Sequence, residues 1–139
     1  MIGIVVSVFN KPITDGLLEG CIKSLNENGL KEENINVVYV PGAFELPAKV
    51  KKLTENNSYD CIIALGCIIK GETDHYQVVK DICLGELYSI ACKNSIPMAT
   101  AVLTVNNYDQ ALERSDIKKK NLGNRAAEVC CNLIKTLRT

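Results

Sequence analysis

Histidine and large aromatic side chains are scarce in this sequence of 139 residues, which contains one histidine, two phenylalanines and no tryptophan. Neither sign of charge is in excess, because sixteen lysines and arginines balance sixteen aspartates and glutamates. Nucleic-acid-binding and anionic-membrane-binding proteins usually carry a basic excess, so the composition argues against both kinds of partner. No apolar run is long enough to cross a bilayer, and Met1 leads into IGIVVSV without a basic segment, so we expect no secretory signal.

Several motifs for metals and nucleotides are also missing. The sequence has no Gly-x-Gly-x-x-Gly fingerprint, no P-loop and no hydroxyl-rich phosphate loop after its first apolar run. Its seven cysteines include no Cys-x-x-Cys pair, and a single histidine adds little to a zinc site. Most of the cysteines lie in apolar periodic segments, where a reduced thiol behaves as a small hydrophobic group. We therefore expect no metal and a reducing, cytoplasmic compartment.

Short apolar runs alternate with helical patterns along the whole chain. Strands are predicted at 2–8, 35–40, 61–66 and 97–105, and helices at 14–28, 44–53, 74–93, 108–114 and 122–137. Strands that are apolar on both faces and alternate with helices are typical of a parallel sheet covered on both sides. With right-handed crossovers, residues 1–139 are predicted to form one α/β domain, a three-layer sandwich with a four-stranded, flavodoxin-like sheet in the order 2-1-3-4.

The candidate functional residues follow the carboxyl ends of the predicted strands. Ligands of such sheets bind at that edge, near the point where the strand order reverses. The segments that follow the strands are Phe9–Asn10, 41–45, 67–75 and Asn106–Asn107, with Arg114 one short helix later. The fold alone leaves the function open, so these residues have to indicate it.

The only histidine, His75, lies in the segment GETDHYQ. A lone histidine is more often a surface or helix-capping residue than a catalytic one. Here, however, Thr73 or Asp74 can cap the next helix with Gln77 completing the box, which places His75 in the first turn. The positive end of a helix favours a neutral imidazole, and such a ring can accept a proton near pH 7.

Two further groups point to a flat, phosphorylated or anionic ligand. Phe9 and Phe44 each follow a strand end, and Glu45 beside Phe44 can accept hydrogen bonds from the N–H groups of a heterocycle. The alternative is that both rings pack under the loops or against a neighbouring subunit. The segment Gly71–Glu72–Thr73 offers backbone N–H groups to an anion such as phosphate. Arg114 or Lys118 could supply the positive charge that balances such an anion. Alternatively, Arg114 only decorates a helix end and Lys118–Lys120 are a solvated loop.

Five stretches together resemble the lumazine synthase family of riboflavin biosynthesis. They are IGIVVSVFN, VPGAFELP, YDCIIALGCIIKGETDHY, IPMATAVLTVNNYDQALER and GNRAAE, in the family's order across nearly the whole chain. The resemblance implies condensation of 5-amino-6-(D-ribitylamino)uracil with L-3,4-dihydroxy-2-butanone 4-phosphate, without a cofactor. Such a reaction depends largely on positioning and on acid/base work.

The resemblance also implies a role for each candidate residue. His75 is expected to transfer protons, and Glu72, Thr73 and Arg114, assisted by Lys118, to hold the butanone phosphate. The pyrimidine substrate is expected to contact the following residues: Phe9, Ala43, Phe44, Glu45, Cys67, Ile68, Ile69 and Thr100. Val8, Lys70 and Thr100 differ from the residues that are frequent in the family.

The resemblance further implies a homo-oligomer with an active site shared between subunits. A homopentamer is favoured over an icosahedral shell, because Lys118–Lys120 lengthen the turn between the last two helices and would repel across a contact between pentamers. Two other classes of function stay open at this point. One is a flavin- or nucleotide-binding module without catalysis, which would tolerate loss of His75. The other is a structural shell protein, which would not need the set of site residues.

Overall fold

The chain folds as alternating strands and helices. The computed structural model describes residues 1–56, 58–71 and 74–137. The elements follow in this order: β1 (Ile2–Ser7), α1 (Lys11–Glu27), the 3-10 helix η1 (Glu32–Asn34), β2 (Ile35–Val40), the 3-10 helix η2 (Ala43–Glu45), α2 (Leu46–Thr54), β3 (Cys61–Ile69), α3 (His75–Lys93), β4 (Met98–Val105), α4 (Tyr108–Ser115) and α5 (Leu122–Leu137).

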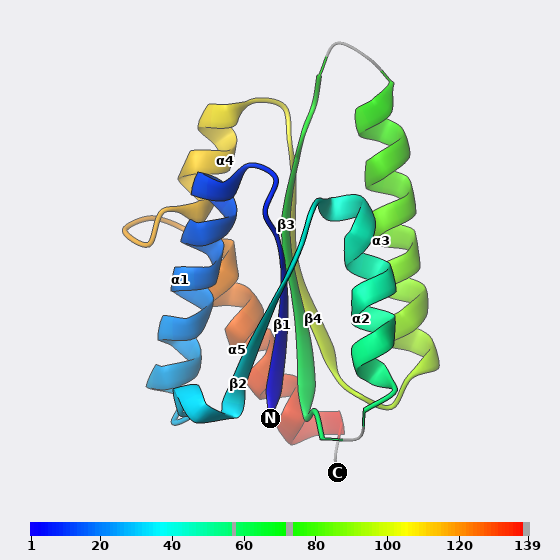
Figure 1. Cartoon of the computed structure of the whole chain (residues 1–139). Helices are drawn as coiled ribbons and strands as arrows, with labels where there is room; N and C mark the ends of the chain where they lie inside the picture. Colours follow the sequence, from blue (N-terminus) through cyan, green and yellow to red (C-terminus); the bar gives the residue numbers. More distant parts are fainter. Residues whose placement is uncertain (57, 72–73, 138–139) are drawn as a thin grey trace.

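The four strands form one parallel sheet in the order β2-β1-β3-β4, as the sequence predicts. Helices α1, α4 and α5 lie on one side of the sheet, and α2 and α3 lie on the other (Figure 1). The predicted three-layer α/β sandwich is therefore confirmed. All four strands point their carboxyl ends toward the same edge, where the segments that carry the candidate residues begin.

The sheet separates two apolar cores, because successive side chains of a strand point to opposite faces. In β1, Ile4 and Val6 pack into the core on the side of α1 and α5, whereas Val5 packs into the core on the side of α2 and α3. The side chains of β3 are buried on both faces up to Ile68, as expected for a central strand of a covered parallel sheet.

Some predicted boundaries were wrong for identifiable reasons. Helix α1 begins at Lys11 rather than at residue 14, because Pro12 fits the first turn, where its missing N–H is not needed. Strand β3 continues three residues beyond Gly66, which the prediction took as its end. A Cβ at Gly66 would lie 2.9 Å from Leu46 Cδ1 and 3.1 Å from Ser7 Oγ, so this glycine allows close packing inside a strand.

Helix α3 does not gather its apolar side chains on a single buried face. Cys83, Leu87 and Ile90 are buried, but Val78 and Ile82 are exposed. Helix α3 therefore carries apolar side chains on more than one face. The exposed ones form part of a surface that the single chain leaves uncovered.

Asn121 connects α1, α4 and α5 below the exposed Lys118–Lys120 turn. Its side-chain amide donates to the carbonyl oxygens of Gly16 at 2.9 Å and Ser115 at 2.7 Å, and its Oδ1 accepts from the N–H of Asn124 at 2.9 Å. The residue is buried, so these bonds replace hydration that the amide has lost. The predicted solvated loop thus ends in a buried connection between three helices.

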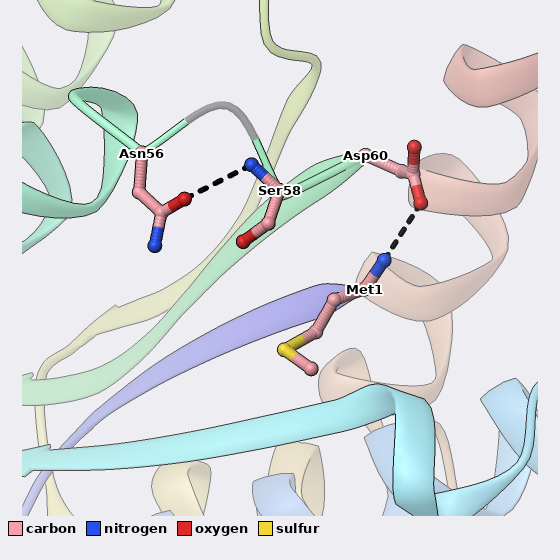
Figure 2. A network of polar contacts seen from close by, with 4 residues as sticks. All are labelled: Met1, Asn56, Ser58 and Asp60. Carbon is pink, nitrogen blue, oxygen red and sulfur yellow. Dashed lines mark hydrogen bonds and ion pairs between the residues drawn. The ribbon is translucent and has the colours of Figure 1, made fainter.

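The opposite, amino-terminal edge of the sheet is closed by short polar contacts (Figure 2). The amino group of Met1 lies 2.7 Å from Asp60 Oδ2, and the N–H of Ser58 donates to Asn56 Oδ1 at 3.0 Å. Both partners of the ion pair are partly exposed, so the pair contributes at most about 1 kcal/mol to stability. This edge lies far along the strands from the candidate residues.

Candidate active site

A cavity of about 820 Å³ opens at the carboxyl edge of β1 and β3, between η2 and the start of α3. It brings together most of the residues proposed from the sequence. Its lining consists of Phe9, Asn10, Gly42, Ala43, Phe44, Glu45, Cys67, Ile68, Ile69, Lys70, Gly71, His75, Tyr76 and Val79.

Backbone hydrogen bonds beyond the end of β1 fix the position of Phe9. The N–H of Val8 donates to the carbonyl oxygen of Val40 at 2.9 Å, and that of Phe9 donates to Pro41 at 3.0 Å. Asn10 then adopts a left-handed conformation (φ 63°), which turns the chain into α1. The Phe9 side chain is left 71% exposed at the cavity.

The segment after β2 supplies the second aromatic ring. The 3-10 helix η2 begins after Gly42, whose carbonyl oxygen accepts from the N–H of Glu45 at 3.1 Å. Ala43 is buried beneath the cavity, while Phe44 is 54% exposed. Within the chain, therefore, neither Phe9 nor Phe44 packs under the loops, and that alternative was wrong. Both rings are free to stack on a flat ligand or on another subunit.

The last residues of β3 form an apolar wall of the cavity. Cys67 and Ile68 are buried, and Ile69 is partly so. Burial raises the pKa of the Cys67 thiol to about 11, so this thiol is protonated at neutral pH. Cys67 can therefore provide an apolar contact but not a thiolate nucleophile.

His75 is the first residue of α3, and its exposed side chain lines the cavity. The predicted capping box of Asp74 and Gln77 was wrong, because Asp74 makes no side-chain capping bond and Gln77 donates instead to Asp81 at 2.9 Å. The other predicted cap, Thr73, lies outside the described residues. The predicted position of His75 in the first turn is nevertheless confirmed. The imidazole thus shares one cavity with two aromatic rings and with the Glu45 carboxylate.

The structure separates Thr100 and Arg114 from this cavity. Both line a groove of about 660 Å³ along β4, one of the two edge strands of the sheet, between α3 and α5. Leu103 pairs with Cys67, so Thr100 lies three residues, roughly 10 Å, before the level of the cavity wall. Arg114 Nη1 donates to the carbonyl oxygen of Gln110 at 3.1 Å, within α4 on the other side of the sheet.

The remaining predicted phosphate ligands are Lys118, Glu72 and Thr73, and of these the structure describes Lys118, which does not line the cavity. Lys118 is exposed in the turn after α4, and its N–H donates to Asp116 Oδ1 at 2.8 Å. Glu72 and Thr73 lie outside the described residues. The described part of the cavity therefore contains the proposed pyrimidine and proton-transfer residues, apart from Thr100, but none of the proposed phosphate ligands.

Two lining residues, Tyr76 and Val79, lie outside the segments proposed from the sequence, and three more, Asn10, Gly42 and Lys70, lie inside those segments without an assigned role. Asn10 and Lys70 could have been found, because each directly neighbours a proposed residue at a strand end. Tyr76 and Val79 follow His75 by one and four residues, a spacing that places them near it on a helix.

The described ranges 1–56, 58–71 and 74–137 contain neither a candidate metal site nor a candidate membrane-spanning helix. No group of three or more histidine, cysteine, aspartate or glutamate side chains there is arranged to hold a metal ion. Nor does that part of the chain contain a helix whose length and apolar character would let it cross a membrane.

Comparisons with known proteins agree along nearly the whole chain. Residues 1–138 match the family model described as 6,7-dimethyl-8-ribityllumazine synthase. A protein of that name from Pectobacterium atrosepticum is 43% identical over 141 residues, covering 99% of this chain and 89% of the relative. Another from Sodalis glossinidius is 40% identical over 137 residues, covering 98% of this chain and 88% of the relative.

Proposed function

The chain belongs to the 6,7-dimethyl-8-ribityllumazine synthase family, and we propose that it catalyses the condensation that forms this lumazine. The substrates are 5-amino-6-(D-ribitylamino)uracil and L-3,4-dihydroxy-2-butanone 4-phosphate, and phosphate and water are released in this penultimate step of riboflavin biosynthesis. The observation that carries the proposal within the structure is the presence of His75, Glu45 and two exposed phenylalanines in one cavity. With its seven cysteines unpaired, the protein suits a reducing, cytoplasmic compartment.

The pyrimidine substrate is proposed to bind between the strand ends. Phe9 stacks on the flat ring, and Ala43, Phe44 and Glu45 surround it from the segment after β2. The carboxylate of Glu45 can accept hydrogen bonds from N–H or hydroxyl groups of the substrate. The apolar wall of Cys67, Ile68 and Ile69 lies on the other side. A mostly apolar cavity with few polar groups suits the orientation of such a ring.

His75 is proposed to move protons during the condensation. The pyrimidine amine is already a nucleophile and the butanone carries its own carbonyl electrophile, so the protein has to bring the two together and transfer protons. Among the described residues that line the cavity, His75 is the side chain with the chemistry for proton transfer near neutral pH. Its exposure in the cavity leaves the imidazole accessible to both substrates.

The butanone phosphate is proposed to be held by Glu72 and Thr73 from one chain and by Arg114 from another, with Lys118 assisting. Arg114 and Thr100 line the β4 groove, outside the cavity of their own chain. A second copy that packed along this edge could bring them to the cavity of its neighbour. The exposed apolar residues Val78 and Ile82 of α3 give such an assembly further surface to bury. We propose a homopentamer, in preference to an icosahedral shell.

Incubation of the protein with both substrates, followed by the absorbance of the lumazine product, tests the proposed function. His75→Ala should lower kcat by about ten- to ten-thousand-fold with little change in KM, because a general acid/base contributes to the transition state. An unchanged kcat would remove His75 from its assigned role. Ligand binding without turnover by the wild type would instead indicate a binding module, and assembly without either would indicate a shell protein.

Mixing inactive variants tests the shared site. His75→Ala and Arg114→Ala chains, unfolded together and reassembled, should regain about a quarter of wild-type activity, since random pairing leaves that share of interfaces with two intact halves. His75→Ala mixed with Glu45→Ala is the matched control, because both changes affect the same half and no interface is restored. Recovery in the control, or none in the first mixture, contradicts a site shared in this way.

A further inference from the structure

Lys70 holds a fixed place at the end of β3. Its backbone N–H donates to the carbonyl oxygen of Val105 at 2.9 Å, so the chain is still tied to β4 at this point. The side chain is exposed and lines the cavity that also contains Glu45 and His75. No ion pair joins Lys70 to another residue that the structure describes.

The charged residues around the cavity indicate that Lys70 is well placed to bind an anion. Among the described lining residues, Lys70 is the only lysine or arginine, and Glu45 is the only carboxylate. Arg114 lines the separate groove along β4, and Lys118 lies in the turn after α4. Of the lysine and arginine side chains that the structure describes, an anion in the cavity of a single chain therefore meets that of Lys70.

We propose that the Lys70 ammonium group binds the phosphate group of the butanone substrate from within the same chain. This inference rests on the proposed function, since it assigns a residue to one of the two substrates. Lysine carries a compact charge with three donors on a flexible four-carbon stem, so it can follow a phosphate group without a fixed geometry. Lys70 and the arginine supplied by a neighbouring subunit would then hold the phosphate from two sides.

A different role for Lys70 would be to balance the carboxylate of Glu45 across the cavity. The two roles predict different kinetic effects. If Lys70 positions Glu45, removal of its charge weakens binding of the pyrimidine, which Glu45 is proposed to contact. If Lys70 binds phosphate, removal of its charge weakens binding of the butanone phosphate and of inorganic phosphate.

Steady-state kinetics of Lys70→Met, Lys70→Arg and Lys23→Met decide between these roles. Lys70→Met should raise KM for the butanone phosphate about ten-fold, because a charge-assisted hydrogen bond is lost. The inhibition constant of inorganic phosphate should rise by a similar factor, while KM for the pyrimidine stays within about two-fold. Lys70→Arg should stay close to the wild type because it keeps the charge. Lys23 is exposed on α1 and distant from the cavity, so Lys23→Met should change neither constant.

The outcomes separate this inference from the proposed function. If the wild type forms lumazine and Lys70→Met leaves the butanone and phosphate constants unchanged, the role of Lys70 is overturned and the function stands. A rise confined to the pyrimidine KM, or equal for both substrates, also overturns it. If the wild type forms no lumazine, the proposed function itself fails, and the inference fails with it.

Discussion

Replacement of Asn121 by alanine should destabilise the protein more than its position in a turn next to three lysines suggests. The Asn121 side chain makes three hydrogen bonds, to the carbonyl oxygens of Gly16 and Ser115 and from the N–H of Asn124. These bonds connect the middle of α1, the end of α4 and the first turn of α5. Gly20 makes room for this amide, since a Cβ there would collide with the Asn121 side chain.

The magnitude follows from what the truncation leaves behind. The Asn124 N–H loses its capping acceptor, which costs about 1 kcal/mol. The carbonyl oxygens of Gly16 and Ser115 each lose a donor, and a buried polar group left without its partner costs roughly 1–3 kcal/mol. Water entering the vacated space and other bonds to the same carbonyls reduce the total, so we expect a loss of about 3–5 kcal/mol in the free energy of unfolding.

Asn107→Ala provides the matched control. Asn107 caps α4 in the same way, with its Oδ1 accepting from the Gln110 N–H at 2.9 Å. This residue is exposed, and its side chain is not hydrogen-bonded to a second helix among the described residues. Urea unfolding followed by circular dichroism should show a loss of about 1 kcal/mol for Asn107→Ala. Equal losses for Asn107→Ala and Asn121→Ala would refute the argument that Asn121 joins three helices.

Three further predictions concern packing, pH and assembly. Gly123→Ala should destabilise the fold by about 1–3 kcal/mol in urea unfolding, because the added methyl group would collide with the Leu17 carbonyl where α5 packs on α1. Gly85→Ala is the control and should not destabilise the fold, because the space around its Cβ is open. Burial raises the pKa of the Cys83 thiol from 9.0 to about 11, so as the pH rises the thiol loses its proton at a lower pH in the unfolded chain than in the folded one. The free energy of unfolding should therefore fall as the pH rises above 9, by roughly 1 kcal/mol at pH 10. The Cys83→Ala variant should show a smaller fall between pH 8 and pH 10. Light scattering after size exclusion should give about 76 kDa, five times the 15.2 kDa chain, and a megadalton particle would contradict the pentamer.

Much of the fold could be predicted because the hydrophobic periodicity of the sequence and its helix-ending and turn residues indicate the same elements. The bounds of β2 and α5 match the prediction, since INVVYV is rich in β-branched residues and α5 has clear helical spacing. The end of β3 could not be predicted, because Gly66 is a turn signal in sequence and a packing position in space. The buried face of α3 also needed tertiary information, because apolar residues occur around most of that helix.

The candidate site shows the same limit at a larger scale. The rule that ligands bind beyond the strand ends placed Phe9, Glu45 and His75 at one edge, and the structure brings them into one cavity. That rule gives positions along the strands but does not say which side of the sheet a following helix covers. It therefore could not show that α4, the predicted helix that carries Arg114, lies in the layer opposite to α3 and its His75 (Figure 1).

The separation of Arg114 from the cavity suggests a role for two surfaces that remain uncovered in a single chain. β4 is an edge strand, and the groove along it exposes Thr100 and Arg114; α3 exposes Val78 and Ile82. A soluble monomer gains nothing from either surface, because unpaired strand edges and apolar patches favour unwanted association. If one copy covers the α3 surface of the next with its β4 edge, the same contact buries both surfaces and completes the phosphate site. On this proposal, assembly and catalysis depend on a single interface. A substitution that prevents assembly should therefore abolish catalysis, even when the cavity itself is unchanged.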